Sequence, residues 1–203
     1  MNKKKAIFIG IIDEKQYTMD LLKQQLMAFN YNLIYSNAKN NLMFLNKDDD
    51  IFVISNIGPD EVDYLEDFGI EFDFMIINII DSKLNEKVRF THQFKECDYY
   101  IINSDEDNLS ILTLEPLDGI VITYGFNSKA TMTLSSYSVD QDMEASLCLQ
   151  RDILTLSGNR IVPFEFIVEI NSKNKDYIYS VLASSILALL LGEEIQYKNN
   201  LKI

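Results

Sequence analysis

Residues 119–137, GIVITYGFNSKATMTLSSY, contain the change between two kinds of sheet that decides this fold. Residues 119–124 form a short apolar run, which is typical of a strand buried on both faces of a parallel sheet. Residues 132–137 are again extended in character, but they follow the break at Gly125 and open a region with turn signals between its strands. We therefore predict that a parallel part of the fold ends near Gly125 and that an antiparallel part begins there.

Upstream of this stretch, short apolar runs alternate with amphipathic segments. The predicted strands are residues 5–12, 33–35, 51–55, 72–80, 99–103 and 119–124. The predicted helices are residues 18–29, 60–68, 87–94 and 106–112. Strands and helices in this alternation are joined by right-handed crossovers, so we predict an α/β fold with a mainly parallel sheet flanked by helices.

Downstream, three extended segments precede a long apolar helix. The extended segments are residues 132–137, 147–154 and 162–170, with a turn predicted at Ser157, Gly158 and Asn159. The helix is predicted over residues 175–191, and Gly192 is placed to end it. We predict a single domain over residues 1–203, with a parallel part (1–125), smaller antiparallel strands (126–174) and a closing helix (175–192).

The composition excludes several classes of function. The chain has 203 residues with 31 acidic and 18 basic side chains, for a net charge of −13. An acidic chain repels nucleic acid and anionic lipid, so we expect neither as a partner. The apolar residues 177–191 are fewer than the roughly 20 that span a bilayer. Cys97 and Cys148 have no nearby cysteine or histidine and are expected to be buried free thiols, so we predict a cytoplasmic protein.

Three acidic clusters are the candidate cation sites, at residues 48–50, 105–107 and 140–144. None of them has the spaced oxygen ligands and central glycine of a calcium loop. All lie at predicted strand or helix boundaries, where acidic residues cap helices and stay hydrated. We therefore assign no metal ligand to this sequence, and the lone histidine, His92, is expected to be a structural or surface residue.

Five segments of the chain carry a family resemblance: IVITYGFN (120–127), SKATMTLSSY (128–137), DYIYSVLASSILALLLG (176–192), CDYYIINSDEDNLSIL (97–112) and FDFMIINIID (72–81). Together they resemble the central domain of the Mur ligase family, which has a P-loop-NTPase-like fold. Their order and spacing agree with the family over nearly the whole chain. The resemblance implies an ATP-dependent amide ligase ancestry, and the family's outer domains have no counterpart in these 203 residues.

The resemblance also implies a nucleotide site, which this sequence has altered. The family's glycine-rich loop binds phosphates through backbone N–H groups, a lysine and a hydroxyl. The matching residues 10–16 lack the two loop glycines and carry Gln16 at the hydroxyl position, and Ile11, Asp13 and Glu14 are expected to crowd the phosphates. The expected remnants of the site are Lys15, Thr18, Asn78 and Asp81. We predict no ATP or magnesium cofactor and assign no catalytic residue.

Three functions remain open. The first is a non-catalytic Mur-ligase-like module that binds another protein or itself, with a link to cell-wall peptidoglycan metabolism. The second is an ATP-dependent amide ligase component that needs a partner subunit. The third is a small-molecule sensor that uses the crevice at the carboxyl ends of the parallel strands. The altered loop favours the first.

Overall fold

A computed structural model describes residues 5–37, 41–58, 61, 69–79, 97–106, 117–139, 143–170, 177–195 and 201–202. The strands of the first half are β1 (Ala6–Asp13), β2 (Asn32–Asn37), β3 (Leu42–Lys47), β4 (Asp50–Asn56), β5 (Phe74–Ile79), β6 (Tyr99–Asn103) and β7 (Ile120–Gly125). The later strands are β8 (Met132–Val139), β9 (Met143–Leu149), β10 (Ile153–Leu154), β11 (Arg160–Ile161), β12 (Phe164–Ile170) and β13 (Leu201–Lys202). The helices are α1 (Tyr17–Ala28) and α4 (Tyr177–Leu190).

One mixed sheet forms the body of the described chain. Its eleven strands follow the order β13-β12-β9-β8-β7-β6-β5-β1-β4-β3-β2, and β10 pairs with β11 in a separate hairpin. Strands β4, β1, β5, β6, β7 and β8 are parallel neighbours, whereas β8, β9 and β12 are antiparallel. The predicted α/β class, with a mainly parallel sheet and a smaller antiparallel region, is confirmed. The change occurs just after Gly125, because β8 pairs with β7 in parallel and with β9 in antiparallel fashion.

The central strands are apolar on both faces, and each face contributes to a different core. Ile11, Ile76 and Ile101 lie in the larger core together with α1 and α4. Their neighbours along the strands, such as Ile12 and Ile77, lie in a second core on the opposite face. Because side chains alternate across a strand, continuous apolar runs are what a sheet buried on both sides requires.

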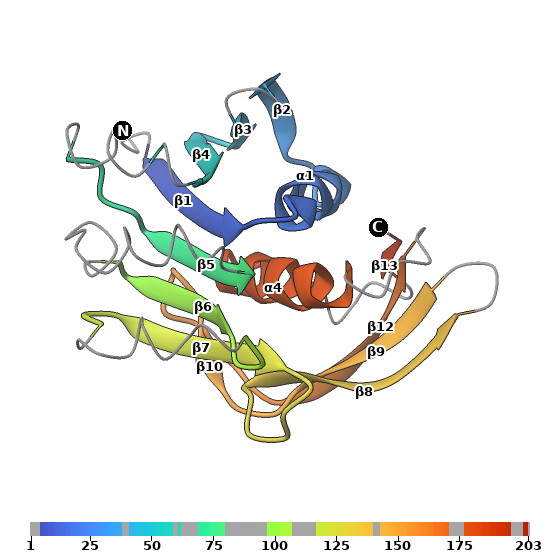
Figure 1. Cartoon of the computed structure of the whole chain (residues 1–203). Coiled ribbons are helices and arrows are strands. Elements are labelled where there is room, and N and C mark those ends of the chain that lie inside the picture. The colour runs from blue at the N-terminus through green and yellow to red at the C-terminus, as the bar shows by residue number, and fades with distance from the viewer. Residues whose placement is uncertain are drawn as a thin grey trace.

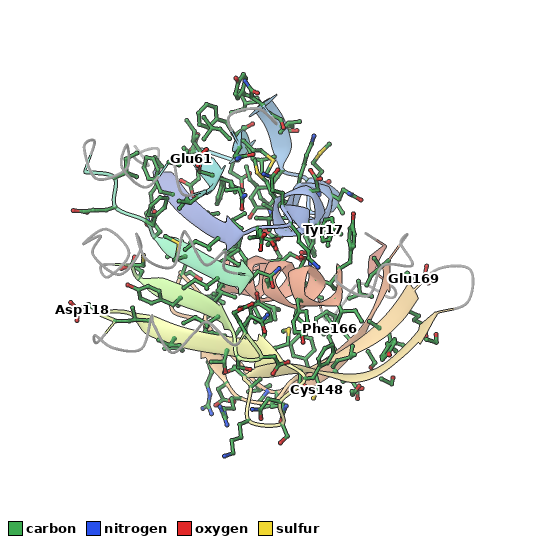
Figure 2. The ribbon with its side chains drawn as sticks, viewed as in Figure 1. Tyr17, Glu61, Asp118, Cys148, Phe166 and Glu169 are labelled. Carbon is green, nitrogen blue, oxygen red and sulfur yellow. The ribbon has the colours of Figure 1, made fainter. Side chains whose placement is uncertain are left out.

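Helix α4 is buried on nearly all sides because the sheet curves around it (Figure 1). Twelve of its fourteen residues are buried, and Phe166 of β12 reaches the same core from the side of the sheet that faces the helix (Figure 2). A helix that is apolar all round is stable only in such an enclosed position. The helix ends at Leu190, and the predicted stop, Gly192, follows two residues later with a φ of +89°, where Glu193 N donates to Ala188 O across 2.9 Å.

The sequence prediction was wrong at the far edge of the sheet. Strand β3 was not predicted, and it runs antiparallel to both of its neighbours, β2 and β4, although all three precede residue 125. The physical reason is the short connection between β3 and β4, where Lys47 pairs with Asp50 and Asp48 has a φ of +52°. A parallel pair needs a crossover of about a dozen residues, whereas a two-residue turn permits only a hairpin.

A second correction concerns the predicted strand over residues 147–154. The structure divides it into β9, which belongs to the large sheet, and β10, which pairs with β11. Gln150 N donates to Thr131 O across 2.8 Å, so the chain turns away from the sheet there. The turn at Gly158, with φ +82°, is confirmed. The predicted helices 60–68, 87–94 and 106–112 lie almost wholly outside the described residues.

Candidate functional site

Four adjacent parallel strands end in buried polar side chains. Asp13 ends β1, Asn56 ends β4, Asn78 lies at the end of β5 and Asn103 ends β6, with exposed fractions of 2%, 3%, 1% and 3%. The carboxyl ends of β1 and β5 meet the helices at this edge (Figure 1). It is the edge at which open α/β sheets bind ligands, so we take these residues as the candidate site.

The carboxylate of Asp13 holds the start of α1. Its Oδ2 accepts hydrogen bonds from Thr18 N at 2.9 Å and from Thr18 Oγ1 at 2.6 Å. Its Oδ1 accepts one from Lys15 N at 3.2 Å. The residue at the N-cap position, Gln16, makes no side-chain cap hydrogen bond. Asp13 therefore satisfies the Thr18 N–H, which the helix start leaves unpaired, and its negative charge is favourable beside the positive end of the helix dipole.

Asn78 and Thr18 are joined in one buried hydrogen-bond network with α4. Asn78 Nδ2 donates to Thr18 Oγ1 at 3.0 Å and to Ser180 Oγ at 3.2 Å. Asn78 Oδ1 accepts from the hydroxyl of Tyr124 at 3.0 Å, and burial raises the pKa of that hydroxyl well above its ordinary range. Each hydrogen-bonding group of the Asn78 side chain is thus paired with a side chain of the same molecule.

The predicted phosphate loop is much shorter than expected. The prediction assigned residues 10–16 to it, but β1 continues through Asp13 and α1 begins at Tyr17, which leaves three residues. Ile11 is buried in the larger core and Glu14 is exposed, so of the three residues expected to crowd the phosphates only Asp13 points into the site. Gly10 lies within β1 for a packing reason, because a Cβ there would lie 2.7 Å from Met75 Cε.

The four predicted remnants of the nucleotide site have different places. Thr18 and Asn78 are in direct contact in the buried network. Lys15 lies on the exposed loop, and its backbone N–H joins the same group of bonds through Asp13. Asp81 and His92 lie outside the described residues. The sequence reasoning missed Ser180 and Tyr124, although hydroxyl side chains within apolar segments were the signal that could have found them.

Asn56 completes the group on the β4 side. Its Nδ2 donates to Asp13 O at 3.3 Å. Its Oδ1 is buried and has no hydrogen-bond partner within the described part of the chain. Buried polar atoms are nearly always paired, so this oxygen marks the β4 side of the site as unusual.

A second carboxylate, Asp105, follows β6 and contacts the carboxyl end of the neighbouring strand β7. Its Oδ2 accepts from Phe126 N at 2.5 Å and from the hydroxyl of Tyr179 at 3.3 Å. Gly125 has a φ of +152°, and a Cβ at this position would lie 2.7 Å from the same oxygen. The glycine of the ITYG segment is therefore required by this contact.

No group of three or more potential metal ligands occurs among the described residues. Asp48 and Asp50 belong to the β3–β4 hairpin, and Asp105 accepts hydrogen bonds as above. Nor does any described helix have the length and apolar content to cross a membrane.

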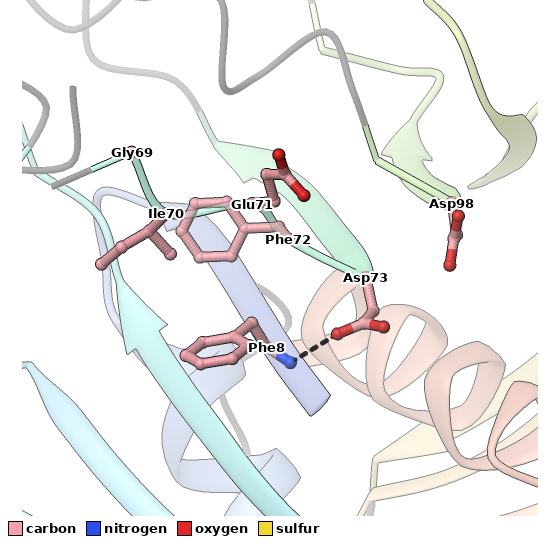
Figure 3. A pocket seen from close by; sticks show the side chains of 7 residues that line it. All are labelled: Phe8, Gly69, Ile70, Glu71, Phe72, Asp73 and Asp98. Atoms are coloured by element: carbon pink, nitrogen blue, oxygen red, sulfur yellow. Dashed lines mark hydrogen bonds between the residues drawn. The ribbon is translucent and has the colours of Figure 1, made fainter. Parts of the chain in front are cut away.

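A hollow of about 600 Å³ lies at the opposite edge of the sheet (Figure 3). Its lining residues are Phe8, Gly69, Ile70, Glu71, Phe72, Asp73 and Asp98. Asp73 and Asp98 precede β5 and β6, so they lie at the amino ends of strands whose carboxyl ends carry Asn78 and Asn103. Asp73 accepts from Phe8 N at 2.8 Å and pairs with Lys5 at 3.5 Å. This hollow is therefore separate from the candidate site.

No protein-family model and no curated protein sequence matches the chain. Solved structures do. A UDP-N-acetylmuramoyl-L-alanyl-D-glutamate–2,6-diaminopimelate ligase aligns over 96% of this chain and 45% of its own, with a TM-score of 0.67 and 11% identity. The murein peptide ligase Mpl of Psychrobacter arcticus aligns over 95% and 45%, with a TM-score of 0.65 and 10% identity.

The MurF ligase of Thermotoga maritima, in complex with ADP, aligns over 95% of this chain and 47% of its own, with a TM-score of 0.60 and 12% identity. The chain thus spans less than half the length of each of these three ligases. Structural matches at such low sequence identity show the fold and do not show the activity. The chain has the fold of the central domain of Mur ligases.

Proposed function

We propose that this chain is a non-catalytic Mur-ligase-like domain that acts as a binding or regulatory module. The observation that carries the proposal is the network in which Asp13, Ser180 and Tyr124 pair with the side chains of Thr18 and Asn78. A nucleotide bound at this edge would have to break buried hydrogen bonds that the chain makes with itself. Each buried group left unpaired costs about 1–3 kcal/mol.

The loop between β1 and α1 supports the same proposal. Three residues, with no glycine among them, separate the strand from the helix. A loop that wraps a phosphate needs close backbone approach and several converging N–H groups, which glycine-rich loops provide. Here the N–H groups of Lys15 and Thr18 are already paired with Asp13.

The names of the structural relatives support a role in cell-wall metabolism. Their names include a murein peptide ligase and a ligase that acts on a UDP-N-acetylmuramoyl peptide. We therefore propose that the module serves cell-wall peptidoglycan metabolism, by binding another protein or a second copy of itself. We propose that the protein lies in the cytoplasm.

Thermal melting with and without millimolar Mg-ATP tests whether nucleotide is used. A ligand at 100 times its Kd adds about 2.7 kcal/mol, which would raise the Tm of a chain of this size by about 5–10 °C. We expect the Tm with Mg-ATP to equal the Tm with magnesium alone. A rise of several degrees would contradict the proposal and favour a ligase component that needs a partner subunit.

A second experiment tests the regulatory role directly. The chain is titrated into each cell-wall ligase of the source organism, and the ligation rate and the mass of the mixture in solution are measured. We expect one ligase to form a stable complex or to change its rate. If no ligase responds and the chain alone stays monomeric, the binding role in cell-wall metabolism is wrong.

A further inference from the structure

Strand β2 is the end strand of the large sheet (Figure 1). Strand β3 pairs with one side of β2, and no strand in the described part of the chain pairs with its other side. A strand in this position presents backbone N–H and C=O groups with which a further β-strand can pair. The occupant that fits such an edge is therefore an extended strand.

The six residues of β2 lack the charged residues and the proline that usually protect an edge strand. Their sequence is NLIYSN. Three large apolar side chains at the centre are exposed, by 36% at Leu33, 58% at Ile34 and 42% at Tyr35. A register shift between Leu33 and Tyr35 also leaves Ile34 without a partner residue on β3. The open edge therefore coincides with exposed apolar surface.

The opposite end of the described sheet differs from the β2 end. Its last strand, β13, has only two residues, one of which is Lys202. The strand beside it, β12, carries Glu165 and Glu169. Short length and charge are the means by which native proteins prevent edge pairing. Of the two ends, only the β2 end is open, so pairing between two β2 strands stops at a dimer and does not continue into a filament.

We propose that β2 is a dimerisation edge, which pairs in antiparallel fashion with β2 of a second copy of this chain. A two-fold axis at the middle of the strand uses the same surface on both copies, so one contact closes both open edges. The polarity of the strand suits this axis, because Asn32 and Asn37 lie at its ends and the apolar residues lie between them. The inference rests on the proposed function and names the partner that it requires.

Charge favours a second copy over a foreign strand at this edge. The chain carries a net charge of −13, so a foreign partner attracted by that charge would be basic. Strand β2 has no carboxylate with which such a partner could pair. The same neutrality allows two β2 strands to meet without placing like charges opposite one another.

The contact is small, so we expect a weak dimer. One strand of six residues is well below the roughly 20–30 residues a side of a standard interface, which predicts a Kd in the micromolar range. Sedimentation velocity of the full chain from about 5 to about 500 µM brackets such a Kd. Salt at about 0.15 M, where the Debye length is about 8 Å, screens the repulsion between the acidic copies. We expect the wild type to shift from monomer to dimer over this range.

The variants compared are Ile34→Lys and the matched control Val162→Lys. Val162 is 59% exposed, against 58% for Ile34, and it lies between β11 and β12. Ile34→Lys should weaken the dimer by about tenfold or more, because the two-fold axis brings two added positive charges together. Val162→Lys should dimerise as the wild type does. Circular dichroism checks that both variants are folded.

Hydrogen exchange of the wild type shows whether β2 itself is the contact. The amides of residues 32–37 should exchange more slowly at high than at low concentration, since pairing protects them. This measurement also tests the inference if Ile34→Lys does not fold. Unchanged exchange of these amides, equal dimerisation of Ile34→Lys and the wild type, or equal weakening by Val162→Lys would overturn the inference.

A wild type that stays monomeric over the whole range overturns the inference too, and leaves a strand of another protein as the occupant of this edge. The proposed function is tested separately. If the wild type is monomeric and a cell-wall ligase still responds to it, this inference alone fails. If the wild type dimerises through β2 but Mg-ATP raises its Tm, the non-catalytic role fails and the dimerisation edge stands.

Discussion

Thr18 Oγ1 lies 2.6 Å from Asp13 Oδ2, so the end of β1 and the first turn of α1 are joined by a short buried hydrogen bond. The same hydroxyl accepts from Asn78 Nδ2 on β5, at 3.0 Å. One side chain therefore connects two parallel strands and a helix at the edge where α/β folds bind ligands. In this chain the connections are internal, so we expect this buried network to stabilise the fold.

Asn78→Ala should lower the free energy of unfolding by about 2–4 kcal/mol, because it leaves Thr18, Ser180 and Tyr124 without a shared partner in a buried site. Urea unfolding followed by circular dichroism measures the change. The matched control is Asn32→Ala at the exposed start of β2, which should stay within about 0.5 kcal/mol of the wild type. Equal effects of the two substitutions would show that the network contributes no special stability.

Gln16→Gly should raise the free energy of unfolding by about 0.5–1 kcal/mol. Gln16 has a φ of +60°, a left-handed conformation that is strained for residues with a Cβ. The control is Glu14→Gly in the same loop, since Glu14 is not among the described residues with positive φ. That substitution should be destabilising because it only adds freedom to the unfolded chain. If both glycines lower the stability, the loop is not strained at Gln16.

Glu193, just after α4, contacts two earlier parts of the chain, and Glu193→Ala should lower the free energy of unfolding by about 2–3 kcal/mol. Its Oε1 accepts from the Tyr31 hydroxyl at 2.8 Å and from Lys47 Nζ at 2.6 Å, although the residues are more than 140 positions apart. A double-mutant cycle with Tyr31→Phe should give a coupling energy of about 0.5–1.5 kcal/mol. The exposed neighbour provides the control, Glu194→Ala, which should be near neutral. A coupling energy of zero would mean that the Tyr31 contact is not stabilising.

The stability should fall as the pH rises above about 9. Burial raises the pKa of the Cys97 thiol from 9.0 to about 12, and burial also raises the pKa of the Tyr100 hydroxyl that Cys97 N contacts at 3.2 Å. The folded chain holds these protons more tightly than the unfolded chain. Their contribution is therefore fully present below the unfolded pKa and is lost as the pH rises toward the folded pKa.

Urea unfolding between pH 7 and pH 11 measures this decline, and Cys97→Ala should make it less steep. In the wild type at pH 8, Cys97 should react with a disulfide reagent only after unfolding, because a buried protonated thiol is a poor nucleophile. Rapid labelling of Cys97 in the folded chain would contradict both expectations.

The sequence by itself determined the local elements and their burial. The runs that became β1, β5, β6 and β7, the apolar α4 and the stop at Gly192 followed from periodicity and turn chemistry, which act over a few residues. The altered loop was also visible there, since its missing glycines are a property of residues 10–16 alone. Phe52, Phe74 and Phe166, each within an apolar run, are buried.

Only the tertiary structure decided which of these elements meet. Periodicity tells how deeply a residue is buried, but it does not identify the neighbour, so the antiparallel β2–β3–β4 edge and the burial of Tyr31 could not be predicted. Thr18 and Ser180 are 162 positions apart in the chain, but their hydroxyl oxygens lie 3.1 Å from one another because α4 packs beside α1. Asp13 was expected to obstruct a phosphate. The folded chain instead surrounds its carboxylate with donors, because the start of α1 lies directly against the end of β1.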